Sequence, residues 1–246
     1  MPDLAQIAGD VLGRVRRESP RVHCLTNTVA EALTANVLLA AGGIPSMTTH
    51  PAEVGAFVEG AGGLLVNLGT PDAERNTAIG LALDAAQHAG VPWVLDPVLI
   101  DRSPLRLDRA RQLLARTPAV VRGNAGEIDA LFANQVPACV VAKSGAEDII
   151  AGGGRTARVR NGHPWMAQVT AMGCAMSALI AAFSAVHEDH FEAAAAALLV
   201  TGVSGDLAAA KAKGPGSFVP GFLDELAGLS AHTLATEAAC EEEENA

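Results

Sequence analysis

The stretch LLVNLGTPDAERNTAIGLALDAAQHAGVPWVLDP, residues 64–97, decides the expected fold of this chain. It opens with a short apolar run at residues 64–68 and closes with a second run at residues 91–95. The segment between the two runs has the apolar spacing of a helix. Fully apolar strands joined by a helix are typical of parallel strands that are buried on both faces. The stretch therefore predicts one strand–helix–strand unit of an α/β sheet.

Two further apolar runs, at residues 119–121 and residues 138–142, extend this pattern. Both end at polar or glycine residues, and the first is followed by another segment with helical spacing. The N-terminal segment predicts an amphipathic helix, and residues 173–186 and 191–212 predict two apolar helices. We therefore expect an α/β fold with a mostly parallel central sheet flanked by helices on both faces.

The chain has 246 residues, with no repeat and no Ser/Pro-rich linker. We expect one domain over residues 1–235. Residues 236–246 include four consecutive glutamates and predict a disordered acidic tail.

The bulk composition argues against several classes of partner. The net charge is −10 and aromatic residues make up 3% of the chain, whereas nucleic-acid binding favours basic and aromatic surfaces. The most apolar later stretch, residues 193–203, is too short for a membrane span. We therefore expect no nucleic-acid and no membrane partner. Widely spaced cysteines and the absence of a signal-peptide pattern predict reduced thiols and a cytoplasmic location.

Polar residues follow each of the four expected strands. They are Asn67, Asp96, Arg122 with Asn124, and Ser144. Ligands of open α/β sheets bind beyond the carboxyl ends of the strands. These residues therefore predict a binding site at that edge of the sheet.

Two acidic residues near this edge have two interpretations each. Asn124 and Glu127 follow a strand and open a helix, so they form either a capping box or part of a Mg²⁺ site beside phosphates. Asp96 is either an ordinary turn residue before Pro97 or a second metal ligand near Glu127.

The turn at residues 169–174 leads into an apolar helix, and its backbone amides can hold a phosphoryl group. Cys174 lies in the first helical turn, where we expect a lowered pKa that lets it accept a proton from a hydroxyl. The alternative is a buried cysteine that fills a small space. Arg122 follows an apolar strand and must meet an anion, either an internal carboxylate or a phosphate.

Four motifs, in this order along the chain, resemble hydroxyethylthiazole kinase, a member of the ribokinase-like superfamily. They lie at residues 66–70, 95–98, 122–128 and 161–163. The resemblance implies phosphorylation of the hydroxyl of 4-methyl-5-(2-hydroxyethyl)thiazole by ATP and Mg²⁺ in thiamine salvage. It also implies a homotrimer with the thiazole site at the subunit interfaces.

The resemblance further implies a role for individual residues. Asn27, Met47 and Ala171 would bind the thiazole. Arg122, Ser144, Asn124 and Gly173 would bind ATP. Asp96 and Glu127 would hold the metal, and Cys174 with Asp96 would be catalytic.

This chain departs from the family pattern in three places. Residues 171–174 read Ala-Met-Gly-Cys where the family usually has Gly-Thr-Gly-Cys, and residues 99–102 lack a usual glycine. The segment at residues 132–139 is shorter than its usual counterpart. Two alternatives therefore stay open: a kinase for another small vitamin-precursor or sugar-like alcohol, or a ligand-binding homologue with weakened catalysis.

Overall fold

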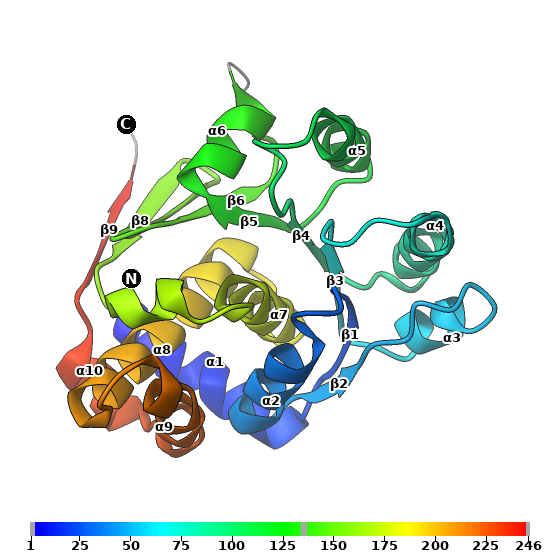
Figure 1. The fold of residues 1–246 in the computed structure, drawn as a ribbon. Coiled ribbons are helices and arrows are strands. Elements are labelled where there is room, and N and C mark those ends of the chain that lie inside the picture. The colour runs from blue at the N-terminus through cyan, green and yellow to red at the C-terminus, as the bar shows by residue number, and fades with distance from the viewer. Residues whose placement is uncertain (1–2, 134–136, 245–246) are drawn as a thin grey trace.

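The computed structural model describes residues 3–133 and 137–244, which fold into a nine-stranded sheet with helices on both faces (Figure 1). The strand order is β2-β1-β3-β4-β5-β6-β7-β8-β9. The strands are β1 (Arg21–Leu25), β2 (Ile44–Ser46), β3 (Gly63–Asn67), β4 (Trp93–Asp96), β5 (Val120–Asn124), β6 (Val140–Ser144), β7 (Asp148–Gly152), β8 (Arg155–Val159) and β9 (Cys240–Glu244). The strands from β2 to β6 in this order are parallel, and β7, β8 and β9 extend the sheet in antiparallel fashion. The predicted α/β fold with a mostly parallel sheet is confirmed.

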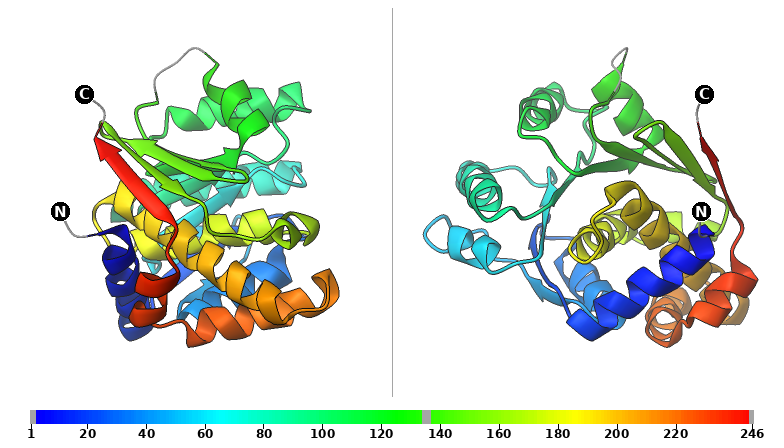
Figure 2. Two further views of the ribbon diagram at one scale, coloured as in Figure 1. Left: turned by 90° about the vertical axis from the view of Figure 1, so that its left-hand side faces the viewer. Right: turned by 180° about the vertical axis from the view of Figure 1, so that it is seen from behind.

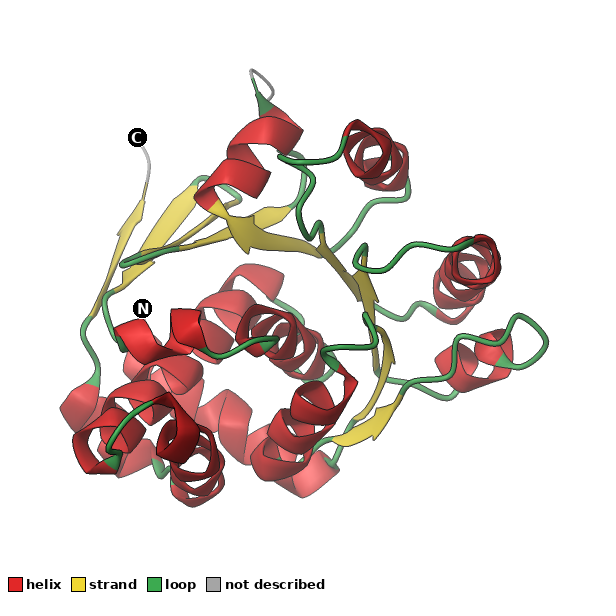
Figure 3. Cartoon of the chain, viewed as in Figure 1, coloured by secondary structure: helices red, strands yellow, loops and turns green. Residues whose placement is uncertain are grey.

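The sheet curves, and two groups of helices cover its two faces (Figures 1 and 3). The outer face carries α3 (Val54–Glu59), α4 (Ala73–Ala89), α5 (Pro104–Leu114) and α6 (Ala125–Phe132). The inner face carries α1 (Leu4–Glu18), α2 (Glu31–Ala41), α7 (Met172–Ser184), α8 (His190–Lys211), α9 (Pro215–Gly228) and α10 (Ala231–Glu237). Each face has its own apolar core cluster, because the side chains of successive strand residues point to opposite faces.

Helix α7 packs directly on the middle of the sheet, and almost all of its residues are buried. Gly63 at the start of β3 makes this approach possible, since a Cβ atom there would lie 2.4 Å from the carbonyl oxygen of Ala181. Because the end of α7 is held at the start of β3, its first turn reaches the carboxyl ends of the strands. The packing of one helix thus positions the edge at which the polar residues gather.

The structure differs from the prediction of a disordered tail at residues 236–246. Within residues 236–244 the chain completes α10 and then forms β9, which pairs antiparallel with β8 at the sheet edge (Figure 2). Arg160 donates to Glu241 of β9, and Asn161 accepts from the backbone N–H of Ala239 at 2.6 Å. These contacts offset the repulsion among the glutamates. We therefore propose that the domain extends to residue 244 rather than ending at 235.

Helix α8 is longer than the apolar stretch at residues 193–203, which it contains. Its 22 residues are long and apolar enough to cross a membrane, but 78% of its most apolar window is buried inside the fold. Mostly buried helices at the centre of a domain commonly have this composition. It is the one helix of this kind among the described residues.

Candidate active site

The polar residues predicted at the strand ends lie together at the carboxyl edge of the sheet. Asn67 and Asp96 are register partners on β3 and β4, and Asn124 and Ser144 are register partners on β5 and β6. The first turn of α7 brings Cys174 to the same edge. One edge of the sheet thus combines residues that are far apart in the sequence.

A hydrogen-bonded cluster connects β3, β4 and α7. Asn67 Nδ2 donates to Asp96 Oδ2 at 2.8 Å and to Cys174 Sγ at 3.2 Å. Asn27, on the loop after β1, donates through Nδ2 to Cys174 Sγ at 3.4 Å and to Asn67 Oδ1 at 3.2 Å. Ser177 Oγ donates to Asp96 Oδ2 at 3.0 Å. We call Asn27, Asn67, Asp96, Cys174 and Ser177 the central cluster.

Asp96 is 1% exposed, and its direct hydrogen-bond donors are neutral groups. Burial raises the pKa of Asp96 to about 6, and the nearby carboxylate of Glu127 acts in the same direction. The positive charge of Arg122 and the hydrogen bonds from Asn67 and Ser177 act against this rise in pKa. Asp96 is therefore ionised at neutral pH and can take up a proton when the pH falls only slightly.

The expected lowering of the pKa of Cys174 is wrong. Burial raises the pKa of this thiol to about 12, and the carboxylate of Asp96 adds to the rise. The amides of Asn27 and Asn67 and the charge of Arg122 oppose it but are outweighed. The partial charge at a helix N-terminus falls off within one turn, and here desolvation is the larger effect. At neutral pH Cys174 is therefore a thiol.

Arg122 lies on β5, against the first turn of α7. A Cβ atom at Gly173 would lie 2.6 Å from Arg122 Nη1, so any larger residue there would displace this guanidinium from its present position. Arg122 Nε donates to Ser144 Oγ at 3.1 Å. The side chain is 9% exposed, and within the part of the chain that the structure describes it makes no ion pair. Arg122, Ser144 and Gly173 are thus brought together as expected.

Asn124 and Glu127 form the capping box of α6. Asn124 Oδ1 accepts from the backbone N–H of Glu127 at 3.0 Å, and Glu127 Oε2 accepts from that of Asn124 at 2.8 Å. Glu127 Oε1 accepts from the backbone N–H of Leu99 at 2.8 Å. The capping interpretation is therefore confirmed. The hydrogen bond between Leu99 and Glu127 also connects the loop after β4 to α6.

The capping role does not exclude a metal beside Glu127, since each carboxylate oxygen can accept further contacts. The described ranges 3–133 and 137–244 hold no group of three or more His, Cys, Asp or Glu residues arranged to bind a metal. Mg²⁺ often binds one or two carboxylates together with substrate phosphates. Asp96 and Glu127 fit that arrangement rather than a cage built by the protein alone.

The turn before α7 keeps a left-handed residue without a glycine. Ala171 has φ 69° and ψ −2°, a conformation that costs an L-residue about 1–2 kcal/mol. Met172 is 2% exposed and packs in the inner core rather than toward solvent. Ala171 therefore adopts the left-handed conformation at the start of α7 although it is not a glycine.

Two predicted features lie apart from the central cluster or outside the described residues. Met47, just after β2, is half-buried against the inner core, and no hydrogen bond joins it to the cluster in the described structure. The shortened segment at residues 132–139 includes residues 134–136, which lie outside the described residues.

The strand-end pattern places Asn67 at the predicted binding edge without an individual role, and Ser177 is not among the predicted residues. Asn67 donates to both Asp96 and Cys174, so it links the two predicted catalytic residues. Its position at a strand end was the available signal. Ser177 lies three residues after Cys174 in an apolar helix, which places both on one face. The hydroxyl group of Ser177 on an otherwise apolar helix is the signal that could have identified this residue.

Comparison with known proteins shows which family this chain is similar to. A family model described as the hydroxyethylthiazole kinase family matches residues 12–138 and 132–232. The chain is 49% identical over 237 residues to a probable hydroxyethylthiazole kinase of Agrobacterium fabrum, covering 96% of both chains. It is 42% identical over 252 residues to a hydroxyethylthiazole kinase of Clavibacter sepedonicus, covering 93% of this chain and 92% of the relative.

Solved structures support the same fold. The hydroxyethylthiazole kinase protein from Pyrococcus horikoshii superposes with a TM-score of 0.94 at 33% identity, covering 97% of this chain and 100% of that one. A ribokinase-like superfamily protein from Enterococcus faecalis shares the fold with a TM-score of 0.64 at 14% identity, covering 91% of this chain and 95% of that one.

Proposed function

Because the chain belongs to the hydroxyethylthiazole kinase family, we propose that it transfers the terminal phosphate of ATP to the hydroxyl of 4-methyl-5-(2-hydroxyethyl)thiazole, a step of thiamine salvage. The observation that carries this proposal is the position of Arg122. It is a buried cation that lies against the first turn of α7 and beside the central cluster. A guanidinium and a helix N-terminus together attract phosphate.

We propose that ATP lies over β5, β6 and the start of α7. Arg122 and the first-turn amides at Gly173 would hold the phosphates, and Ser144 and Asn124 at the strand ends would contact the nucleotide. The first amides of a helix have no partner within the helix, so they are free to donate to phosphate oxygens. In phosphoryl transfer the protein acts mainly by positioning the reactants and neutralising charge.

The thiazole would lie on the other side of Cys174, near Asn27, Ala171 and Met47. We propose that its hydroxyl is placed against Cys174 and loses its proton toward Asp96. Asp96, with a pKa of about 6, is ionised at neutral pH, whereas the thiol, with a pKa of about 12, is not. Asp96 is therefore the better proton acceptor of the two catalytic candidates.

Asp96 and Glu127 would hold Mg²⁺ that arrives with the phosphates of ATP. The fit rests on two carboxylates close enough to influence each other at the end of the sheet. When bound, the ion supplies positive charge that neutralises the phosphates.

The proposed activity is tested by mixing the protein with ATP, Mg²⁺ and the thiazole alcohol, and by following ADP and the phosphorylated thiazole. 4-Methyl-5-ethylthiazole, which lacks the acceptor hydroxyl, is the matched control and should give no product. ADP formation no faster with the alcohol than with this control would refute the proposal. A panel of other vitamin-precursor and sugar-like alcohols tests the alternative substrates, and tight binding without ADP would favour a weakened homologue.

We also propose a cytoplasmic homotrimer with the thiazole site at the subunit interfaces. Three apolar side chains near β2 and the loop after β1 are well exposed in the single chain: Val29 at 64%, Phe57 at 44% and Ile44 at 41%. A partner subunit would cover such residues. Sedimentation velocity should give about three times the 25.0 kDa chain mass, and Val29→Asp should lower it. A monomeric parent protein would contradict the assembly.

A further inference from the structure

Helices α4 and α5 lie next to each other on the outer face of the sheet (Figure 1). Residues of both helices line a cleft of about 590 Å³. It opens at the carboxyl edge and shares Asn67 and Gly69 with the region of the central cluster. The proposed ATP residues on β5, β6 and α7 do not line it. The cleft is therefore a separate hollow next to the site described above.

The lining of the cleft is positively charged, although the chain as a whole is acidic. Arg75 of α4 and Arg106 and Arg109 of α5 line it, together with a single carboxylate, Asp108. The chain as a whole carries a net charge of −10. Asp72 and Glu31 act on Arg75 from outside the lining, and within the lining only Asp108 opposes the repulsion among the three guanidinium groups.

Two of these guanidinium groups have unused buried donors. Arg75 is 5% exposed, and its Nη2 donates to the carbonyl oxygen of Asn67 at 3.2 Å. Its Nε and that of Arg109 are buried and have no hydrogen-bond partner within the described residues. A buried N–H that is left unpaired costs about 1–3 kcal/mol, and the cost is larger for charged groups. An acceptor in the cleft would remove this cost.

The geometry points to a second anion site: we propose that the cleft between α4 and α5 binds the phosphate group of a small phosphorylated molecule. Phosphate suits the cleft because its oxygens can accept from several guanidinium groups at once, often in bidentate fashion. A hollow of this size also has room for a small organic group attached to the phosphate.

The cleft is physically connected to the central cluster. Arg75 donates to the backbone of Asn67, whose side chain donates to both Asp96 and Cys174. A ligand that pulls on Arg75 would therefore act on the residue that orients both catalytic candidates. This connection makes the cleft a place where a phosphorylated metabolite can change activity at a distance.

The test is calorimetric titration of the full chain with pyrophosphate in an Arg122→Gln background, which weakens the proposed ATP phosphate site. We expect pyrophosphate binding to persist there, and to weaken about tenfold or more when Arg109→Gln is added. Arg109→Lys keeps the charge but loses the guanidinium donors, so its affinity should lie between those of the Arg122→Gln parent and the Arg109→Gln variant. Arg111→Gln, an exposed arginine on α5 that does not line the cleft, is the matched control and should change nothing.

Loss of all binding in Arg122→Gln alone, or equal affinity with and without Arg109→Gln, would overturn the proposal. Thermal unfolding of each variant checks that it is folded, and Arg106→Gln repeats the test from a second position. Crystals soaked with tungstate should show the anion between α4 and α5, and density only at α7 would also overturn it. These outcomes do not depend on thiazole turnover, so the failure of one proposal is distinguishable from failure of the other.

Discussion

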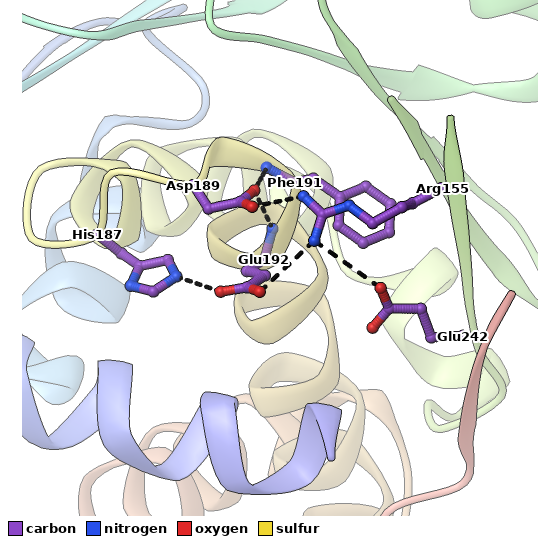
Figure 4. Close-up of polar contacts among 6 residues, drawn as sticks. All are labelled: Arg155, His187, Asp189, Phe191, Glu192 and Glu242. Atoms are coloured by element: carbon purple, nitrogen blue, oxygen red, sulfur yellow. Dashed lines mark hydrogen bonds and ion pairs between the residues drawn. The ribbon is translucent and has the colours of Figure 1, made fainter. Parts of the chain in front are cut away.

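Asp96 and Asp189 both accept hydrogen bonds at the end of a secondary-structure element, but their surroundings differ. Asp96 is 1% exposed and its direct donors are the neutral groups of Asn67 and Ser177. The side chain of Asp189, the N-cap of α8, is 38% exposed and pairs with Arg155 of β8 (Figure 4). Burial raises the pKa of Asp96 to about 6. Burial also acts to raise the pKa of Asp189, but the hydrogen bonds from Arg155 and from backbone N–H groups outweigh burial and lower this pKa.

The network around Arg155 joins three parts of the chain at the sheet edge. Arg155 pairs with Asp189, with Glu192 of α8 and with Glu242 of β9, and its guanidinium lies 4.3 Å from the ring centroid of Phe191 (Figure 4). His187 contacts Glu192 at 2.6 Å. The three acids of this network all pair with one cation, Arg155, as expected of residues that stabilise a fold. The central cluster instead keeps a carboxylate buried beside neutral donors, which costs stability and is typical of a functional site.

The largest expected effect concerns the catalytic use of Asp96. Asp96→Asn keeps the shape and the acceptor oxygen but removes the charge, so we expect turnover to fall by about 100-fold or more. The rate of ADP formation at saturating substrates measures this. Asp84→Asn, an exposed residue on α4, is the control and should leave the rate unchanged. A rate within twofold of the parent protein would place Asp96 outside the chemistry.

The same substitution should raise stability at neutral pH. The pKa of Asp96 is raised from 3.8 to about 6 in the folded state, which corresponds to about 3 kcal/mol at most. Its favourable contribution is complete below about pH 4 and is lost as the pH rises through about 6. Asn stays neutral, so the stability gain of Asp96→Asn over the parent protein should grow between these pH values and then level off. Urea unfolding from pH 4 to 8 measures it, and a difference that does not vary with pH would contradict the raised pKa.

A smaller effect is expected at the Arg155 network. Arg155→Gln removes three ion pairs and the contact with Phe191, each worth at most about 1 kcal/mol near the surface. We expect a loss of about 1–2 kcal/mol in the free energy of unfolding and faster hydrogen exchange in β9. Thiazole turnover should be unchanged. Arg17→Gln, an exposed residue of α1, serves as the control. Equal exchange rates in β9 would show that the network does not hold the strand.

The smallest effect tests backbone strain next to the central cluster. Ala171→Gly removes the cost of the left-handed conformation but adds flexibility to the unfolded chain, so we expect a net gain of about 0.5–1 kcal/mol. Ala115→Gly, at a right-handed position that ends α5, should instead lose about as much. Chemical unfolding of the pair gives the comparison. A loss at both positions would show that the turn at Ala171 is unstrained.

The parts of the fold that the sequence predicts are those where one local pattern agrees with the tertiary structure. Strands β3 to β6 are apolar runs buried on the sheet, and each ends at the predicted polar residues. Strands β7 and β8 are not predicted because buried and partly buried residues alternate along them, and charged residues such as Asp148 and Arg158 interrupt any apolar run. Glutamates disfavour a strand, and β9 forms only because β8 and its flanking arginines pair with it.

The same distinction between local sequence patterns and tertiary contacts applies to the site. Strand-end positions identify Asp96, Arg122 and Ser144 from local sequence alone, because all parallel strands end at one edge. The links through Asn67 and Ser177 cross between β3, β4 and α7, so no local pattern contains them. The pKa of Cys174 was predicted in the wrong direction because burial is a property of the packed core and not of the helix turn. Which residues touch ATP, the thiazole or Mg²⁺ stays a prediction.

The two edges of the sheet have a consequence for how copies of this chain behave at high concentration. An open edge strand offers unpaired backbone groups to other molecules and can start aggregation. Here one edge is β2, a strand of three residues that contains Pro45. The other is β9, which presents the exposed glutamates Glu241 and Glu243. Strand-to-strand association is therefore opposed at one edge by shortness and at the other by charge, and acidification removes only the second protection.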